Sequence, residues 1–408
     1  MMATLAYAYK GRDAQGKNVK GRLEASTEIN AAVRLRSMGV SPTSIEESKE
    51  GTGLNMEIKF LSKGVGLKDL AIMSRQMATM IAAGLSLLRT LTILAEQTEN
   101  KALASTLGEV RSDIEGGSSL SASFAKFPRV FPRLMIHLVR AGETGGFLDG
   151  ALESIANNFE SDVKLRATIK SALTYPIAVL IMAFVAVIAM LIFIVPVFQA
   201  MFSSLGGTLP LPTQILVTLS QNMVWIFPLL VVLIVGFNVW WKFNKEKDKV
   251  RSITDPLKLK IPVFGGLFAK VAVARFTRNF SAMIAAGVPI LQSLSIVGET
   301  SGNWVIEDGL KKVQESVRTG NSIAAPLASQ PIFPSMVVQM IAVGEDSGAL
   351  EIMLTKVADF YEEEVQSTAE ALTSLIEPLM IAVIGTVIGG MIVALYMPIF
   401  TIFNAINK

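Results

Sequence analysis

Cysteine is absent from the 408-residue sequence, and histidine occurs once, as His137. The missing thiols exclude disulfide bonds, zinc sites built from thiolates and thiol nucleophiles. The single histidine has no acid or base partner near it in the sequence, so we interpret it as structural rather than catalytic. There is also no Walker A phosphate loop, and the chain itself is therefore not an NTPase.

Charged residues are also scarce, and they are unevenly distributed. They make up 17% of the chain, against about 25% in soluble domains. None occurs between Lys170 and Lys242, and 379–407 is a second uncharged run. A helix of about 20 apolar residues crosses a bilayer, and the apolar stretches lack the polar stripe of a soluble helix. We predict three spans in the lipid bilayer, at 176–198, 224–241 and 378–403.

The basic residues around these spans predict their orientation. Lys164, Arg166 and Lys170 precede the first span, five Lys or Arg residues follow the second within 242–251, and 199–223 carries no charge. Because basic residues are enriched in cytoplasmic segments, we expect the N-terminus in the cytoplasm, 199–223 as an extracytoplasmic loop and the C-terminus outside. The net charge of +3 is too small to indicate a nucleic-acid partner.

The first 60 residues read as a small cytoplasmic module, 1–60. Alternating residues predict a strand at 5–9 and a return strand at 19–25. Thr27 is a suitable cap for a helix over 28–38. We interpret the module as a docking or regulatory element without chemistry of its own.

A helical pattern begins at Leu67 and predicts a first cytoplasmic bundle over 67–175. Its six segments are joined by short loops, which is typical of an antiparallel bundle. Pro176 stands at the entry to the first span, where a proline would kink the helix or mark its restart. The six predicted helices are 67–83, 86–98, 101–115, 118–126, 132–141 and 148–174.

The same pattern occurs a second time. RQMATMIAAGLSLLRTL from Arg75 matches RNFSAMIAAGVPILQSL from Arg278 at an offset of 203, and AGETGGFL from Ala141 matches VGEDSGAL from Val343 at an offset of 202. One deletion between about 120 and 130 reconciles the two offsets.

The repeat predicts a second cytoplasmic bundle over 270–377, with Pro378 in the position of Pro176. The span at 224–241 is then required to return the chain to the side of the first bundle. The predicted fold is an all-α integral membrane protein, with a duplicated six-helix cytoplasmic bundle plus transmembrane helix and three transmembrane helices in total.

A GE-x-x-G motif recurs between the fifth and sixth helix of each copy. Its glycines permit positive φ and close backbone approach. One interpretation is a tight interhelical turn whose glutamate caps the next helix; the other is a corner that binds a partner. The motif residues are Gly142, Glu143, Gly146, Gly344, Glu345 and Gly348.

Three acidic residues of the first bundle could converge if its second and sixth helices pack together. They are Glu96, Asp149 and Glu153. Calcium takes carboxylate oxygens of this kind, while the alternative is solvated surface acids. The second copy has Thr355 in place of Glu153, so such a site would belong to one bundle only.

The third span carries a G-x-x-x-G pattern at Gly385 and Gly389, which permits close helix–helix contact in lipid. No ionisable residue lies inside any span, where ion-coupled transporters place them. We therefore favour a scaffold over a small-molecule transporter or channel, and we find no residues that indicate catalysis or a cofactor.

Two further runs complete the pattern, KSALTYPIAVLIMA at 170–183 and IVPVFQAMFSSLGGTLPLPTQILVTLS at 194–220. Together with the duplicated motifs and the three spans, they make the chain similar to the inner-membrane platform proteins of type IV pili and type II secretion, the type II secretion F family. The resemblance covers nearly the whole chain. The N-terminal pattern, which includes Tyr9, Gly11 and Asp13, resembles the pilus branch of the family more than the secretion branch.

This resemblance implies a homo-oligomer in the cell inner membrane at the base of a pilus machine. Its bundles would contact a hexameric cytoplasmic assembly ATPase, and its spans would meet pilin or pseudopilin subunits and other inner-membrane assembly proteins. The equivalent platform of type II secretion is the alternative. Some secretion members are associated with calcium at the first bundle.

Overall fold

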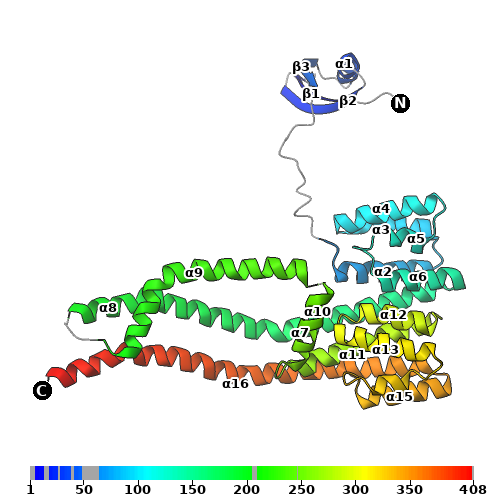
Figure 1. Ribbon diagram of the computed structural model, residues 1–408. Coiled ribbons are helices and arrows are strands. Elements are labelled where there is room, and N and C mark those ends of the chain that lie inside the picture. Colours follow the sequence, from blue (N-terminus) through cyan, green and yellow to red (C-terminus); the bar gives the residue numbers. More distant parts are fainter. Residues whose placement is uncertain are drawn as a thin grey trace. The chain divides into compact units, whose positions relative to one another are not determined.

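In the computed structural model the chain divides into two units, residues 1–63 and 64–408 (Figure 1). Thr27, the predicted helix cap, lies outside the described residues, as do residues 48–63 before the first bundle. The described ranges are 5–12, 18–25, 28–37, 41–47, 64–204, 209–245 and 247–406.

The N-terminal unit is a three-stranded antiparallel sheet in the order β2-β1-β3, with one helix. Its elements are β1 (Leu5–Arg12), β2 (Asn18–Ala25), α1 (Glu28–Ser37) and β3 (Ser41–Glu47). The first two strands and the helix were predicted, but β3 was not. It carries Pro42 opposite a register shift after Lys10, and proline is tolerated on an edge strand at such a place.

The first bundle has the six helices that the sequence predicts. Side chains of Ser86, Asn100 and Ser119 accept hydrogen bonds from the first backbone N–H groups of three of them, which satisfies donors left free at a helix start. The helices are α2 (Leu67–Ala82), α3 (Leu87–Gln97), α4 (Lys101–Glu115), α5 (Leu120–Ala125), α6 (Arg133–Gly145) and α7 (Leu148–Ala189).

The second bundle repeats the first. The bounds of α12 and α13 follow those of α3 and α4 at an offset of 203, and α15 follows α6 at 202, so the predicted duplication and its register are confirmed. The helices are α11 (Gly265–Ala285), α12 (Ile290–Thr300), α13 (Trp304–Arg318), α14 (Ala324–Ala328), α15 (Ser335–Ser347) and α16 (Leu350–Ile406).

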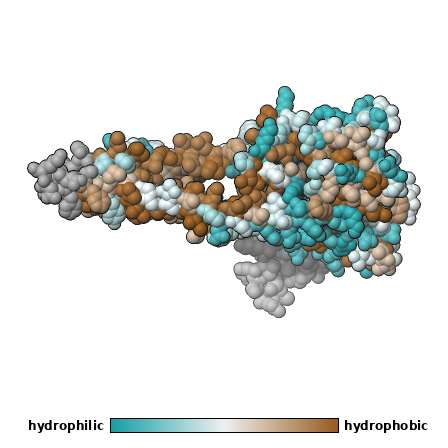
Figure 2. All heavy atoms as spheres, turned by 90° about the horizontal axis from the view of Figure 1, so that it is seen from below, coloured by the Kyte–Doolittle hydropathy of each residue, from teal (hydrophilic) through white to brown (hydrophobic). Residues whose placement is uncertain are grey.

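Within the described residues, three helices are long and apolar enough to cross a membrane, which confirms the predicted number of spans. Figure 1 shows them extending from the bundles, and Figure 2 shows hydrophobic residues along them and hydrophilic residues gathered over the bundles. They comprise Leu148–Phe202, which includes a π-helical turn η1 (Met190–Ile194) and most of α8 (Val195–Ser204); α9 (Leu211–Asn244); and Leu350–Phe400 of α16.

The stretch 199–223 is mostly helical, so its prediction as a loop is wrong in conformation. Residues 199–204 end α8, and 211–223 begin α9. Thr213 donates a hydrogen bond to the carbonyl of Ala394, and Ser220 donates to the carbonyl of Leu191. These hydroxyls face neighbouring helices. The charge-free composition of the stretch suits a loop and a helix equally, which is why the prediction of a loop failed.

Neither proline at a span entry breaks its helix. Pro176 lies inside α7 and Pro378 inside α16. Of the two predicted alternatives, a kink or a restart of the helix, the restart is therefore wrong, and each bundle is joined to its span by one continuous helix.

One helix escaped the sequence analysis, α10 (Asp248–Lys260). Its charges and internal Pro256 do not resemble a core helix. The buried Asp255 accepts hydrogen bonds from the backbone N–H of Trp304 at 3.0 Å and from Lys258 at 2.8 Å. The segment that follows α9 is thereby attached to the start of α13 in the second bundle.

Candidate functional site

The GE-x-x-G motif starts inside a helix rather than between two helices. Gly142 and Glu143 lie in the last turns of α6, and Gly146 ends that helix in the left-handed conformation at φ 74°. Gly348 does the same for α15 at φ 68°. A glycine in this conformation is a common helix C-terminus because it has no Cβ to clash. The predicted end of this helix at 141 was therefore four residues too early.

The motif glutamates bind the backbone of their own bundle. The Glu143 carboxylate accepts hydrogen bonds from the N–H groups of Leu120 at 2.5 Å and Ser121 at 3.2 Å. Both donors belong to α5, which precedes the motif. The glutamate therefore caps a helix, as one interpretation predicted, but it caps the preceding helix and not the following one. An anion here satisfies two free donors at a helix start.

The second copy repeats this contact. Glu345 accepts from Ile323 at 2.7 Å and from Ala324 at 3.0 Å, at the start of α14. Its occurrence in both copies indicates a structural constraint on the bundle, and these carboxylates are already engaged inside the chain.

The first glycine of each motif permits close helix approach. A Cβ on Gly142 would lie 2.6 Å from the Cβ of Ala151, and one on Gly344 would lie 2.9 Å from the Cα of Leu350. Real atoms do not approach this closely, so a side chain at either position would push the last two helices of the bundle apart.

An arginine clasp joins the first and last helices of each bundle. Arg75 of α2 donates to Glu160 at 2.6 Å and to Asn157, both on α7. The hydrogen bond with Arg75 lowers the pKa of Glu160, and the same bond raises the pKa of Arg75.

In the second bundle Arg278 of α11 donates to Glu362 at 2.8 Å and to Asp359 at 2.6 Å, both on α16. Burial lowers the pKa of Arg278, but the hydrogen bonds to the two carboxylates outweigh it and the net shift is upward. The clasps hold each membrane-directed helix to its own bundle.

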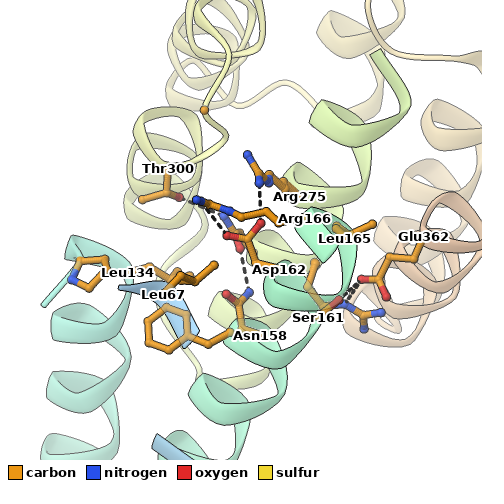
Figure 3. A pocket seen from close by; sticks show the side chains of 15 residues that line it. Leu67, Leu134, Asn158, Ser161, Asp162, Leu165, Arg166, Arg275, Thr300 and Glu362 are labelled. Atoms are coloured by element: carbon orange, nitrogen blue, oxygen red, sulfur yellow. Dashed lines mark hydrogen bonds and ion pairs between the residues drawn. The ribbon is translucent and has the colours of Figure 1, made fainter. Parts of the chain in front are cut away.

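A polar seam joins the two bundles. Helix α7 packs against α11 and α16, and α6 packs against α12. Asn158 donates to Asn279 at 2.7 Å where both are buried, and Asp162 pairs with Arg275 at 2.6 Å (Figure 3). Ser161 hydrogen-bonds Glu362. The seam was not predicted from the sequence, although Asn158 and Arg275 have apolar equivalents in the other copy, Phe360 and Ile72.

A cavity of about 260 Å³ lies along the seam. Figure 3 shows side chains from both bundles around it, including Asn158, Asp162 and Arg275. Its arginines are already paired with carboxylates of the seam and the clasps. Each lining arginine therefore already has a carboxylate partner, with Asp162 shared by Arg166 and Arg275.

The three acids predicted to bind calcium do not gather. Among the residues that the structure describes, no three Asp, Glu or His side chains are placed to hold a metal ion. Glu96 is on α3, which packs on α2 and α4, while Asp149 and Glu153 are on α7, which packs on α2 and α6. All three are exposed, as the alternative interpretation of surface acids requires.

The span glycines have no neighbour in the described chain. A Cβ on Gly385 or Gly389 would meet nothing within 4 Å. The spans of this chain instead pack through a cluster that includes Leu191, Val217 and Leu395. The predicted glycine-mediated packing therefore does not occur between the described helices of one chain, and contact with another molecule stays a prediction.

His137 lies in the seam, where its Nδ1 is 3.3 Å from the amide nitrogen of Gln292 on α12. Burial lowers the pKa of His137 from 6.5, Arg140 and Arg133 lower it further, and Glu299 opposes them. Protonation therefore favours the unfolded state. This contribution to stability is complete above pH 6.5 and is lost as the pH falls from 6.5 toward the lower folded-state pKa.

We expect His137→Gln, which installs the residue found at the equivalent Gln339, to flatten the pH dependence of stability across this window. The measurement is the thermal unfolding midpoint of the full chain in detergent, for wild type and variant, above and below pH 6.5. Parallel pH profiles for the two proteins would contradict the assignment.

Comparisons with known proteins agree with this duplicated architecture. The family described as type II secretion system (T2SS), protein F matches residues 73–196 and 276–398, one segment in each copy. The family described as type II secretion system protein F, N-terminal domain matches residues 2–46.

Relatives from both machines align over nearly the full length. The type IV pilus assembly protein PilC of Thermus thermophilus is 41% identical over 404 residues, which cover 98% of this chain and 99% of the relative. PilC of Pseudomonas aeruginosa is 39% identical over 377 residues, or 91% and 98% of the two chains. The type II secretion system protein F of Vibrio cholerae is 31% identical over 406 residues, or 99% and 100%.

Proposed function

Because the chain belongs to the type II secretion system protein F family, we propose that it is the inner-membrane platform of a type IV pilus assembly machine. The observation that carries the pilus assignment is the 41% identity over 98% of the chain to a pilus assembly protein, compared with 31% to a secretion protein. The role is that of a scaffold rather than an enzyme. The type II secretion platform is the alternative.

We further propose that the bundles receive movement from a hexameric cytoplasmic ATPase and pass it to pilin subunits at the spans. The continuity of α7 and α16 through Pro176 and Pro378 supports this, because an unbroken helix transmits displacement along its axis. The N-terminus and the bundles would lie in the cytoplasm and the C-terminus outside.

The corner motifs are poor probes of ATPase contact. Glu143 and Glu345 are engaged as internal caps, so their replacement acts first on folding. Exposed neighbours such as Thr144 and Asp346 are the corner residues that a partner would reach.

Deletion of the gene is expected to abolish surface pili and leave the export of secreted enzymes unchanged. Pili are counted by electron microscopy, with the gene restored from a plasmid as the control. Normal pili with enzymes trapped in the envelope would transfer the proposal to secretion. If neither process changes, the platform assignment is wrong, and flux through vesicles that contain the purified chain would test the transporter alternative.

A further inference from the structure

The seam joins two faces that are not equivalent in the repeat. The first bundle contributes α6 and the side of α7 that carries Asn158 and Asp162, which we call the front face. The second contributes α11, α12 and the side of α16 that carries Glu362, which we call the back face. Asn158 and Asp162 represent the front face, and Arg275 and Asn279 the back face. An interface between two different faces of similar units is heterologous, and it leaves one copy of each face unused.

The unused front face lies on the second bundle. At an offset of 202, Asn158 corresponds to Phe360 and Ala141 to Val343. Asn158 is 6% exposed in the seam, whereas Phe360 is 44% exposed and Val343 is 54% exposed. Hydrophobic side chains therefore replace seam residues on this face, although no described part of the chain covers them.

The unused back face lies on the first bundle. At an offset of 203, Arg275 corresponds to Ile72 and Asn279 to Gln76. Ile72 is 49% exposed and Gln76 is also exposed, while Asn279 is buried in the seam. Here too an apolar residue stands where the seam has a charged one.

We propose that these two unused faces bind each other between neighbouring copies of this chain. The front face of one second bundle, with Val343 and Phe360, would dock on the back face of the next first bundle, with Ile72 and Gln76. The contact would continue the geometry of the seam from one chain to the next. Repetition of a heterologous contact closes a ring where the rotation permits.

The occupant is a second copy because the faces already have a partner of the right shape inside the chain. Three helices of each bundle, α3, α4 and α6 against α12, α13 and α15, have equal lengths and a matching register, so the seam is a template for the new contact. The seam and the proposed contact differ in chemistry. Where the seam has the Asn158–Asn279 hydrogen bond, the contact between chains would have Phe360 beside Gln76, so it is more apolar than the seam.

This difference also separates the two contacts. A first bundle from another chain would place Ile72 opposite Asp162 if it entered the seam, and Asp162 would lose its ion pair with Arg275. Glu364, the equivalent of Asp162 on the second bundle, is instead paired with Lys270 of its own chain at 2.7 Å, so Ile72 opposite Glu364 breaks no ion pair. The seam is therefore selective for the second bundle, and the apolar faces remain for assembly between chains.

The absence of cysteine allows a direct test by disulfide trapping in membranes. Gln76→Cys and Phe360→Cys are placed in two differently tagged copies of the full chain and coexpressed. We expect a disulfide that joins the two tags under mild oxidation. The matched control pair is Glu109→Cys with Lys312→Cys, two equivalent exposed residues on α4 and α13, which should give little product.

Charge at Ile72 provides a second arm that leaves the buried core intact. Ile72 would face Glu364, the equivalent of Asp162. Lys270 pairs with Glu364 at 2.7 Å in its own chain. Ile72→Asp should reduce the 76–360 disulfide severalfold, because its carboxylate would be buried beside Glu364 without a cation of its own, whereas Ile72→Arg can share Glu364 with Lys270 and should preserve the disulfide. Disulfides between identical positions would show an isologous contact instead, and product no greater than in the control pair would show that another molecule covers these faces. Either result overturns the proposal, and neither depends on pilus or secretion phenotypes.

Discussion

Replacing Glu143 with alanine is expected to lower the free energy of unfolding by about 2–4 kcal/mol, because two N–H groups lose a charged acceptor at a partly buried helix start. The groups are those of Leu120 and Ser121, bound at 2.5 and 3.2 Å. Glu345→Ala should have a similar effect through Ile323 and Ala324. The measurement is urea unfolding of the bundles in the full chain, held in detergent and followed by circular dichroism.

Glu143→Gln is the informative comparison, because glutamine keeps one acceptor oxygen and should recover part of the loss. Asp346→Ala is the control, since this residue is adjacent to Glu345 but exposed. If Glu143→Ala unfolds like wild type and yet abolishes pili, the glutamate acts on a partner rather than as a cap.

Gly344→Val is expected to destabilise the second bundle by about 3 kcal/mol, because overpacking at a close helix contact forces the backbone to move. Its Cβ would lie 2.9 Å from the Cα of Leu350 and 3.3 Å from the Cβ of Met353. Backbone atoms cannot rotate away as a flexible side chain would. Gly142→Val should act in the same way on the first bundle, where Ala151 is the obstacle. The same urea unfolding measures both.

Substitutions at two uncrowded glycines are the controls, because they replace glycine without creating a close contact. Gly108 lies within α4 and has open space around it, so Gly108→Ala should stabilise the chain by about 0.5–1 kcal/mol. Gly385→Val in the third span should leave the unfolding of the bundles unchanged, since nothing lies within 4 Å. If substitution at Gly344 and at Gly108 lowered the free energy of unfolding equally, crowding at Gly344 would not be the cause of its loss.

The three spans, the six-helix pattern and the duplication could all be predicted from the sequence. These depend on local signals: an uncharged stretch between Lys170 and Lys242, a helical pattern that begins at Leu67, and repeated segments at two constant offsets. Hydrophobic period and capping act within a few turns of one helix, so a single sequence is enough to recognise them.

The tertiary structure decided what each motif contacts. Spacing alone did not show that Glu143 binds α5 behind it, that Glu96 lies apart from Asp149, or that α7 continues through Pro176. These outcomes depend on which helices pack together, and a cap or an ion pair over 20 or more residues forms only once packing has brought its ends together.

The seam was also decided by packing. Asn158 and Phe360 occupy equivalent places in two similar bundles, yet one is buried and the other exposed. The repeat makes the bundles alike, but two bundles on one chain meet through unlike faces, and this asymmetry breaks the equivalence of their surfaces. The sequence determined the units, and only their packing determined which surfaces face each other and which remain open to a partner.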